Sequence, residues 1–348
     1  MDQCFSPLTL RETIFPNRVM LSPMCMYSAG DDGKVTDWHL AHYLARAVGR
    51  VGLIMLEATA VEARGRISQN DLGLWEDAQI APLARLVSTL HNEGAIAGVQ
   101  LAHAGRKAWG PAEGQGPEPA VAPSALPFDK PWATPHALTE VGLEGVITAW
   151  KAAAARAAQA GFDVIEIHAA HGYLNHQFLA PLTNQRTDSY GGDLQQRMTF
   201  LLRVVDAVRS VWSPSQPLFV RLSTTDWGTP GGLTVEDSVT IARALSAHGV
   251  DLVDCSSGGL SPARPQAVWP GYQIPFAERL RREASVRTAA VGLITTPEMA
   301  DEIIRNGRAD MVALGRELLR HPYWALDAAS ALRQEILWPE QYNRARRV

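Results

Sequence analysis

Eight short apolar segments, separated by longer amphipathic ones, are the feature that most limits what this chain can fold into. Buried strands of a parallel sheet are continuous runs of Val, Ile and Leu, and a helical crossover returns the chain to the next strand. Eight such units fit an α/β protein with a (β/α)₈ TIM barrel better than a doubly wound sheet, which usually has fewer strands. The expected strands are residues 19–24, 53–61, 95–103, 163–168, 218–223, 251–256, 287–293 and 311–315.

Three further segments complete the predicted architecture. Residues 8–17 are expected to form a short N-terminal hairpin that plugs the bottom of the barrel. Thr295, Pro297 and Glu298 predict a helix start with Thr295 as N-cap, and this helix should stop at Gly307. Residues 108–136 hold seven of the 22 prolines and form an extended loop after the third strand, either functional or a plain surface insertion. We expect residues 1–348 to form one domain.

The composition excludes several classes of protein. The 348 residues carry a formal charge of −4 without long charged runs, which argues against a nucleic-acid partner. No apolar run is long enough for a membrane helix, and the N-terminus has no signal-peptide pattern. Three scattered cysteines make neither a disulfide framework nor a CxxC metal site. We therefore predict a cytoplasmic protein that does not bind membranes.

The fourth unit carries the densest group of reactive side chains. Strand alternation points Glu166 and His168 into the barrel, at the end where barrel enzymes place catalytic residues, and His171 and Tyr173 follow the strand. Two imidazoles can bind a carbonyl oxygen or oxyanion, and a phenol can donate a proton. The alternatives are a metal site, for which Glu166 is the only local third ligand, and a purely structural role.

The last two strands end in a predicted phosphate site. Gly292 and Gly315 let an anion approach the backbone, Arg316 adds a fixed positive charge, and barrels commonly bind phosphate after strands 7 and 8. The alternative is two glycines in routine turns.

Inward-facing side chains on other strands favour a phosphorylated cofactor. Gln100 and Arg221 suit the carbonyls and N1 of an isoalloxazine ring, because a positive charge stabilises reduced flavin. Arg221 could instead form a buried ion pair with Glu57 or Glu166.

Four motifs in this order resemble the Old Yellow Enzyme family of FMN-dependent ene-reductases. They are S-P-M-C-M-Y (22–27), Q-L-A-H-A-G-R-K (100–107), I-H-A-A-H-G-Y-L (167–174) and N-Q-R-T-D-S-Y-G-G (184–192). Cys25 and Tyr27 resemble the thermophilic-like subclass. The resemblance covers nearly the whole chain, and only residues 108–136 and the C-terminal residues depart from the expected pattern.

The resemblance implies a cofactor, a reductant and a reaction. FMN would accept hydride from NADPH or NADH and pass it to the β-carbon of an activated alkene, which is the small-molecule partner. His168 and His171 would bind the carbonyl oxygen of the substrate, and Tyr173 would protonate its α-carbon. Tyr27 would line the substrate pocket. The residues implied to bind FMN are Pro23, Met24, Cys25, Ala58, Gln100 and Arg221 at the ring, and Gly292, Gly315 and Arg316 at the phosphate.

The resemblance also implies a homodimer or homotetramer, in which Arg344 reaches the active site of a neighbouring subunit. The alternative for the tail, residues 338–348, is a frayed basic terminus. Other functions remain open: a larger dienoyl-CoA reductase or amine dehydrogenase type, a phosphate-binding lyase or aldolase without flavin, and a barrel without enzymatic activity. The dienoyl-CoA reductase or amine dehydrogenase type carries a cysteine cluster that this chain lacks. The lyase or aldolase usually needs a Schiff-base lysine or a metal, and the expected strands contain no lysine.

Overall fold

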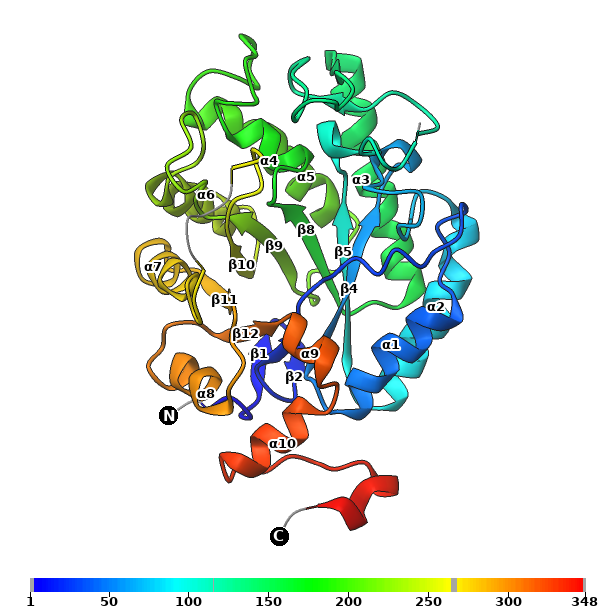
Figure 1. Ribbon diagram of the computed structural model, residues 1–348, viewed down its shortest axis with the longest axis vertical. Coiled ribbons are helices and arrows are strands. Elements are labelled where there is room, and N and C mark those ends of the chain that lie inside the picture. The colour runs from blue at the N-terminus through cyan, green and yellow to red at the C-terminus, as the bar shows by residue number, and fades with distance from the viewer. Residues whose placement is uncertain (1–2, 115, 264–267, 347–348) are drawn as a thin grey trace.

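A closed barrel of eight parallel strands forms the centre of the protein (Figure 1). This computed structural model describes residues 3–114, 116–263 and 268–346. Each barrel strand pairs with the next one along the chain, and the last pairs with the first. The predicted TIM barrel is confirmed. Its strands are β3 (Val19–Leu21), β4 (Leu53–Ala60), β5 (Ile96–Ala102), β8 (Val164–Ala169), β9 (Leu218–Ser223), β10 (Leu252–Ser256), β11 (Arg287–Val291) and β12 (Met311–Leu314).

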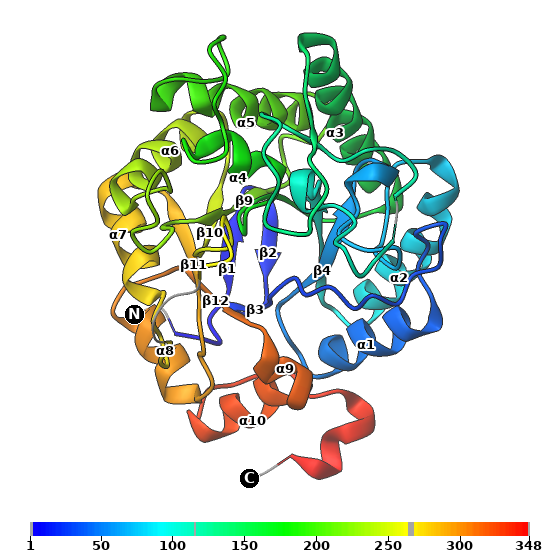
Figure 2. The same cartoon turned by 45° about the horizontal axis from the view of Figure 1, so that its top comes forward.

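Helices surround the barrel, as Figure 2 shows. They bury one apolar face against the strands, and for α3 this face includes Leu143, Ile147 and Trp150. None of the helices in the described ranges is long and apolar enough to cross a membrane. The helices are α1 (Asp37–Val48), α2 (Ile80–Asn92), α3 (Glu140–Ala160), α4 (Leu174–Leu179), α5 (Leu194–Arg209), α6 (Val235–Ala247), α7 (Ile274–Ala284), α8 (Pro297–Arg305), α9 (Arg316–Arg320) and α10 (Trp324–Ala331).

Some predicted boundaries are wrong by one to three residues. Strand β3 ends at Leu21, before Pro23, which has no N–H to donate to a neighbouring strand. Strand β11 ends at Val291 because Gly292 has φ +130° and leaves the strand conformation. The N-cap of α8 is Thr296, whose hydroxyl accepts from the Met299 amide, so the predicted cap at Thr295 was one residue early.

The predicted N-terminal hairpin closes the lower end of the barrel. Strands β1 (Leu8–Leu10) and β2 (Thr13–Phe15) pair antiparallel. Their side chains Leu8, Leu10 and Phe15 are buried in a cluster with inward-facing residues of the barrel strands. This burial keeps water out of the barrel from below.

The proline-rich loop lies over the other end of the barrel. It contains the strand β6 (Val121–Ala122), which pairs in parallel with β7 (His136–Ala137), an element that the sequence pattern did not predict. Arg106 donates from its guanidinium to the carbonyls of Pro127, in this loop, and Leu260, after β10. The loop is therefore fixed to the rim where the strands end.

Candidate active site

A cavity of about 330 Å³ opens at the carboxyl ends of the barrel strands. The chain segments that follow β3, β8, β10, β11 and β12 form its wall. The structure thus brings together residues from sequence regions nearly 300 positions apart. The predicted site residues that line it are Pro23, Met24, His171, Arg221, Gly292, Gly315 and Arg316.

One end of the cavity has the predicted shape and charge of an anion site. Gly292 adopts φ +130°, and a Cβ atom there would lie 3.2 Å from Gln273 Nε2 and Tyr272 Cε1. Only glycine leaves this space open. Arg316 is joined by Arg320, which the sequence analysis did not single out. Glu317 lines the same recess and ion-pairs with Arg320, so Arg316 is the cation left to bind a phosphate there.

His168 and His171 form a directly bonded pair. His168 Nε2 lies 3.3 Å from His171 Nδ1, and His171 Nε2 lies 2.7 Å from the hydroxyl oxygen of Ser256. His168 Nδ1 accepts from the Ala170 amide at 3.1 Å, which assigns the proton of His168 to Nε2. That proton points toward His171 Nδ1, so the proton of His171 is on Nε2 and faces Ser256. Ser256 was missed by the sequence analysis because a lone serine carries no spacing signal.

Burial keeps both imidazoles neutral. It holds the pKa of His168 and that of His171 well below the ordinary value, and the positive charge of Arg221 adds to the effect. A neutral imidazole has one N–H to donate. The N–H of His168 is directed to His171 and that of His171 to Ser256, so a bound oxygen would have to replace these acceptors.

Tyr173 stands edge-on to the His168 ring, with 4.9 Å between ring centroids. Burial raises the pKa of the Tyr173 phenol well above its ordinary value, with further contributions from Cys25, Tyr27 and Asp71. The phenol stays protonated at neutral pH. A proton donor and two oxygen-binding rings are thus adjacent.

Lys107 is a residue whose place in the site the sequence analysis missed. Its Nζ lies 4.9 Å from the ring centroid of Tyr173 and 4.8 Å from that of Phe128, in the proline-rich loop. The same Nζ donates to the carbonyls of His171 at 2.8 Å and Gly259 at 3.3 Å. Burial, assisted by the charge of Arg106, lowers the pKa of Lys107 to about 8. Lys107 therefore connects the loop, the phenol and the His171 backbone.

Cys25 and Tyr27 lie on the segment after β3. Burial raises the pKa of the Cys25 thiol well above the ordinary value, and the charges of Asp71 and Glu57 add to the rise. A protonated thiol is a poor nucleophile. The buried carboxylate of Glu57 accepts from the Met26 amide at 2.8 Å and so fixes this segment from behind.

Gln100 and Arg221 both lie inside the barrel with acidic partners. Gln100 Nε2 donates to Glu166 at 2.8 Å. Arg221 Nε lies 3.2 Å from Asp254, so neither Glu57 nor Glu166, the alternatives named from the sequence, is its ion-pair partner. Glu57 instead contacts His39, at 3.3 Å.

Arg344 is exposed in a 3₁₀ helix, Glu340–Ala345, and does not line the cavity of its own chain. Residues 347–348 of the predicted tail lie outside the described residues. Among the residues that the structure does describe, no three His, Cys, Asp or Glu side chains converge to hold a metal ion.

The glycine-lined recess fits the phosphate of FMN, and the buried guanidinium of Arg221 fits its ring system. Gly292, Gly315 and Arg316 can hold a phosphate, and Arg221 presents a positive charge to the same cavity. The barrel, the anion recess and the paired imidazoles define the class: an FMN-dependent TIM-barrel oxidoreductase.

Comparisons with known proteins agree with this class. Residues 3–335 match the model of the NADH:flavin oxidoreductase / NADH oxidase family. The chain is 52% identical over 346 residues to the NADPH dehydrogenase of Listeria monocytogenes serotype 4a (strain HCC23), covering 99% of both chains. It is 53% identical over 341 residues to the NADPH dehydrogenase of Geobacillus thermodenitrificans (strain NG80-2), covering 98% of this chain and 97% of the relative.

Solved structures are similar over nearly the same length. Morphinone reductase has a TM-score of 0.82 and 30% identity, covering 97% of this chain and 92% of its own. An Old Yellow Enzyme homologue from Zymomonas mobilis has a TM-score of 0.80 and 25% identity, covering 97% and 94%. The chain belongs to the NADH:flavin oxidoreductase / NADH oxidase family, which includes the Old Yellow Enzymes. It is an NAD(P)H-dependent oxidoreductase with FMN as cofactor.

Proposed function

We propose that this enzyme reduces activated C=C bonds of α,β-unsaturated carbonyl or nitro compounds. The observation that carries the proposal is the neutral His168–His171 pair with Tyr173 beside it, at the mouth that also holds Arg221 and the anion recess. FMN, when bound, supplies hydride from its N5 to the β-carbon of the substrate. Negative charge then develops on the carbonyl or nitro oxygen.

In this proposal His168 and His171 stabilise that developing charge through their N–H groups, and the Nε2–H of His168 would have to turn from His171 Nδ1 to the substrate oxygen. Hydrogen-bond donors that are fixed in place before reaction are worth most in a site that excludes water. The Nε2–H of His171 faces Ser256 at 2.7 Å, so a substrate oxygen would compete with the serine hydroxyl for this donor. Tyr173 protonates the α-carbon, which its raised pKa allows because the phenol carries its proton at neutral pH.

The remaining residues would bind FMN or line the substrate pocket. Gly292, Gly315 and Arg316 would hold the phosphate of FMN, while Gln100 and Arg221 would face its pyrimidine ring. Pro23, Met24, Cys25 and Ala58 would contact the ring edge, and Tyr27 would line the substrate pocket. We further propose a cytoplasmic homodimer or homotetramer that presents Arg344 to the neighbouring active site.

The test is anaerobic reduction of the purified protein with NADPH or NADH, followed by mixing with 2-cyclohexenone, a maleimide or a nitroalkene. We expect the flavin absorbance to return as the alkene is consumed. If every activated alkene leaves the flavin reduced, the proposed reaction is wrong even though the protein is a flavoenzyme.

A further inference from the structure

Glu166 and Asp254 lie in the barrel interior on either side of Arg221. They come from β8 and β10, and Arg221 lies on β9 between them. Register places Arg221 directly beside Asp254 and places Gln100 directly beside Glu166. Both carboxyl groups are fully buried, with 0% exposure. On the other side of Arg221 the register places His168, and Glu166 lies two residues before it on β8, beside Phe219. All four polar side chains are buried inside the barrel.

This buried group contains two carboxyl groups and one guanidinium. Arg221 is the only cation that ion-pairs with either acid among the described residues, through Asp254 at 3.2 Å. Glu166 Oε2 and both carboxyl oxygens of Asp254 have no hydrogen-bond partner in the described part of the chain. Two ionised carboxylates with one guanidinium would leave an uncompensated charge in a dry interior, at an effective penalty of several kcal/mol. A proton on one carboxyl removes that charge.

The other ionisable groups nearby do not supply a second positive charge. His168, two residues beyond Glu166 on β8, and His171 are held neutral by burial. Burial raises the pKa of Glu166 to about 8, and repulsion from Asp254 adds to the rise while Arg221 and Gln100 oppose it. Burial also raises the pKa of Asp254, against the attraction of Arg221.

We propose that Glu166 and Asp254 share one proton in the oxidised enzyme and take up a second one when the flavin is reduced. The proposal rests on the proposed function, in which Arg221 faces the pyrimidine ring of FMN. Hydride transfer from NAD(P)H leaves NAD(P)⁺ and adds two electrons and one hydrogen to the flavin, so the ring gains one negative charge. One H⁺ from solvent then binds the remaining carboxylate. It returns to solvent when an alkene reoxidises the flavin.

Arg221 provides the electrostatic connection. In the oxidised enzyme the positive charge of Arg221 attracts the ionised carboxylate of the pair. This attraction lowers the proton affinity of that carboxylate and keeps it ionised. A negative charge arriving on the cavity side of Arg221 repels that carboxylate and raises its affinity for a proton. The pair thereby offsets the charge of the reduced cofactor.

The experiment counts protons. FMN-loaded protein in weakly buffered solution is reduced with stoichiometric NADH without oxygen, and proton uptake per flavin is read with a pH indicator at several pH values near 8. We expect the double variant Glu166→Gln/Asp254→Asn to lose most of one proton of uptake per flavin. Each single variant should keep that uptake, because one carboxylate remains near Arg221 to be protonated. In a two-electron couple, the loss of one proton of uptake reduces the slope of the midpoint potential against pH by about 30 mV per pH unit.

Asp310→Asn is the matched control. Asp310 is also a buried acid, but it lies before β12 at the opposite end of the barrel and pairs with Arg281 at 3.0 Å. This variant should keep the proton uptake of the wild type.

Three results separate the possible failures. Unchanged uptake in the FMN-loaded double variant would overturn the proton pair and leave the proposed function intact. Uptake by the wild type that equals that of free FMN at every pH would also overturn it, whether or not the variants fold. A protein that does not bind FMN at all would instead refute the flavin site on which the proposal rests.

Discussion

Gly259 lies against the backbone of His171 so closely that a Cβ atom on Gly259 would be 2.6 Å from His171 Cα. Gly172 meets the same loop from the other side, where an added Cβ would lie 2.1 Å from the Gly259 carbonyl oxygen. His171 itself adopts φ +57°, a conformation that non-glycine residues seldom adopt. The orientation of the His171 ring therefore depends on a loop residue that has no side chain.

Gly259→Ala should displace His171 without emptying the flavin site. We expect phenol, a mimic of the substrate oxyanion, to bind at least about tenfold more weakly, because one of the two N–H donors moves. Spectral titration of the FMN-loaded variant measures this affinity. Gly94→Ala is the control, since Gly94 has φ +76° but nothing within 4 Å of an added Cβ. Equal phenol affinity in the Gly259 variant and the wild type would show that the close contact does not position His171.

Replacing either imidazole should slow the transfer of hydride to the alkene. His168→Ala and His171→Ala each remove a donor from the developing oxyanion, and we expect a loss of roughly 10² in that step. Stopped-flow mixing of the reduced enzyme with 2-cyclohexenone measures it. A loss that appears equally in flavin reduction by NADPH would indicate a disturbed flavin site instead.

Tyr173→Phe should spare flavin reduction by NADPH and slow alkene reduction. The variant keeps the ring that contacts His168 and Lys107 but loses the proton. The two half-reactions are measured separately by stopped-flow absorbance. Unchanged turnover of enones in this variant would assign the proton to water or to another residue.

The elements of the fold could be predicted because each depends on a local pattern. The run 218–223 is apolar enough to be a buried strand in any context, and β9 has those bounds. His168 and Tyr173 could be found for the same reason, since they lie in one short motif. The Thr296 cap was misplaced by one residue because two threonines precede Pro297 and only the backbone decides which one caps.

Partners that barrel closure brings together could not be predicted in this way. Asp254 is Arg221's neighbour because β9 and β10 pair in one register, and the sequence does not state that register. Lys107 follows β5 in a motif that was recognised, but its contacts with Tyr173 and Phe128 depend on how the proline-rich loop folds back. A lysine outside the strands carries no signal of such contacts.

Glu166→Gln should remove a loss of stability that occurs as pH rises from about 5 to 8. The carboxyl of Glu166 has a raised pKa in the folded protein, about 8 against an ordinary 4.5, so it contributes stability below 4.5 that disappears as pH rises toward 8. A glutamine does not titrate. We expect Tm of the wild type to fall more steeply than that of the variant between pH 5 and 8, measured by calorimetry on FMN-loaded protein. Parallel curves would mean that Glu166 is ionised in the folded state.

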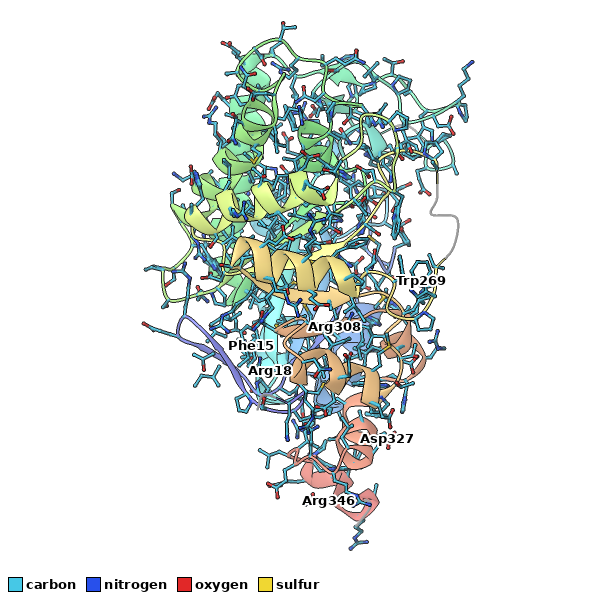
Figure 3. All side chains as sticks on the ribbon, turned by 90° about the vertical axis from the view of Figure 1, so that its left-hand side faces the viewer. Phe15, Arg18, Trp269, Arg308, Asp327 and Arg346 are labelled. Atoms are coloured by element: carbon cyan, nitrogen blue, oxygen red, sulfur yellow. The ribbon has the colours of Figure 1, made fainter. Side chains whose placement is uncertain are left out.

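Residues 340–346 of the C-terminal tail are exposed on their own subunit. Leu337 is 85% exposed, and the 3₁₀ helix Glu340–Ala345 buries none of its residues. The contact between the Tyr342 and Tyr323 hydroxyls, at 3.4 Å, is one of its few attachments. Figure 3 shows Arg346 near the lower end of the molecule and Asp327 above it, and the two residues line one surface cavity.

Truncation after Trp338 should therefore change the active site only if a neighbouring subunit uses the tail. We expect the intact protein to be a dimer or tetramer by light scattering. Truncation should raise the KM for bulky aromatic enones more than it raises the KM for 2-cyclohexenone. The physical reason is that the guanidinium of Arg344 can stack on an aromatic substrate at the edge of the partner's pocket. Arg344→Ala tests the side chain without shortening the chain, and Arg346→Ala is the charge-matched control. A monomeric protein, or KM values that neither truncation nor Arg344→Ala alters, would show that the tail is a solvent-exposed terminus.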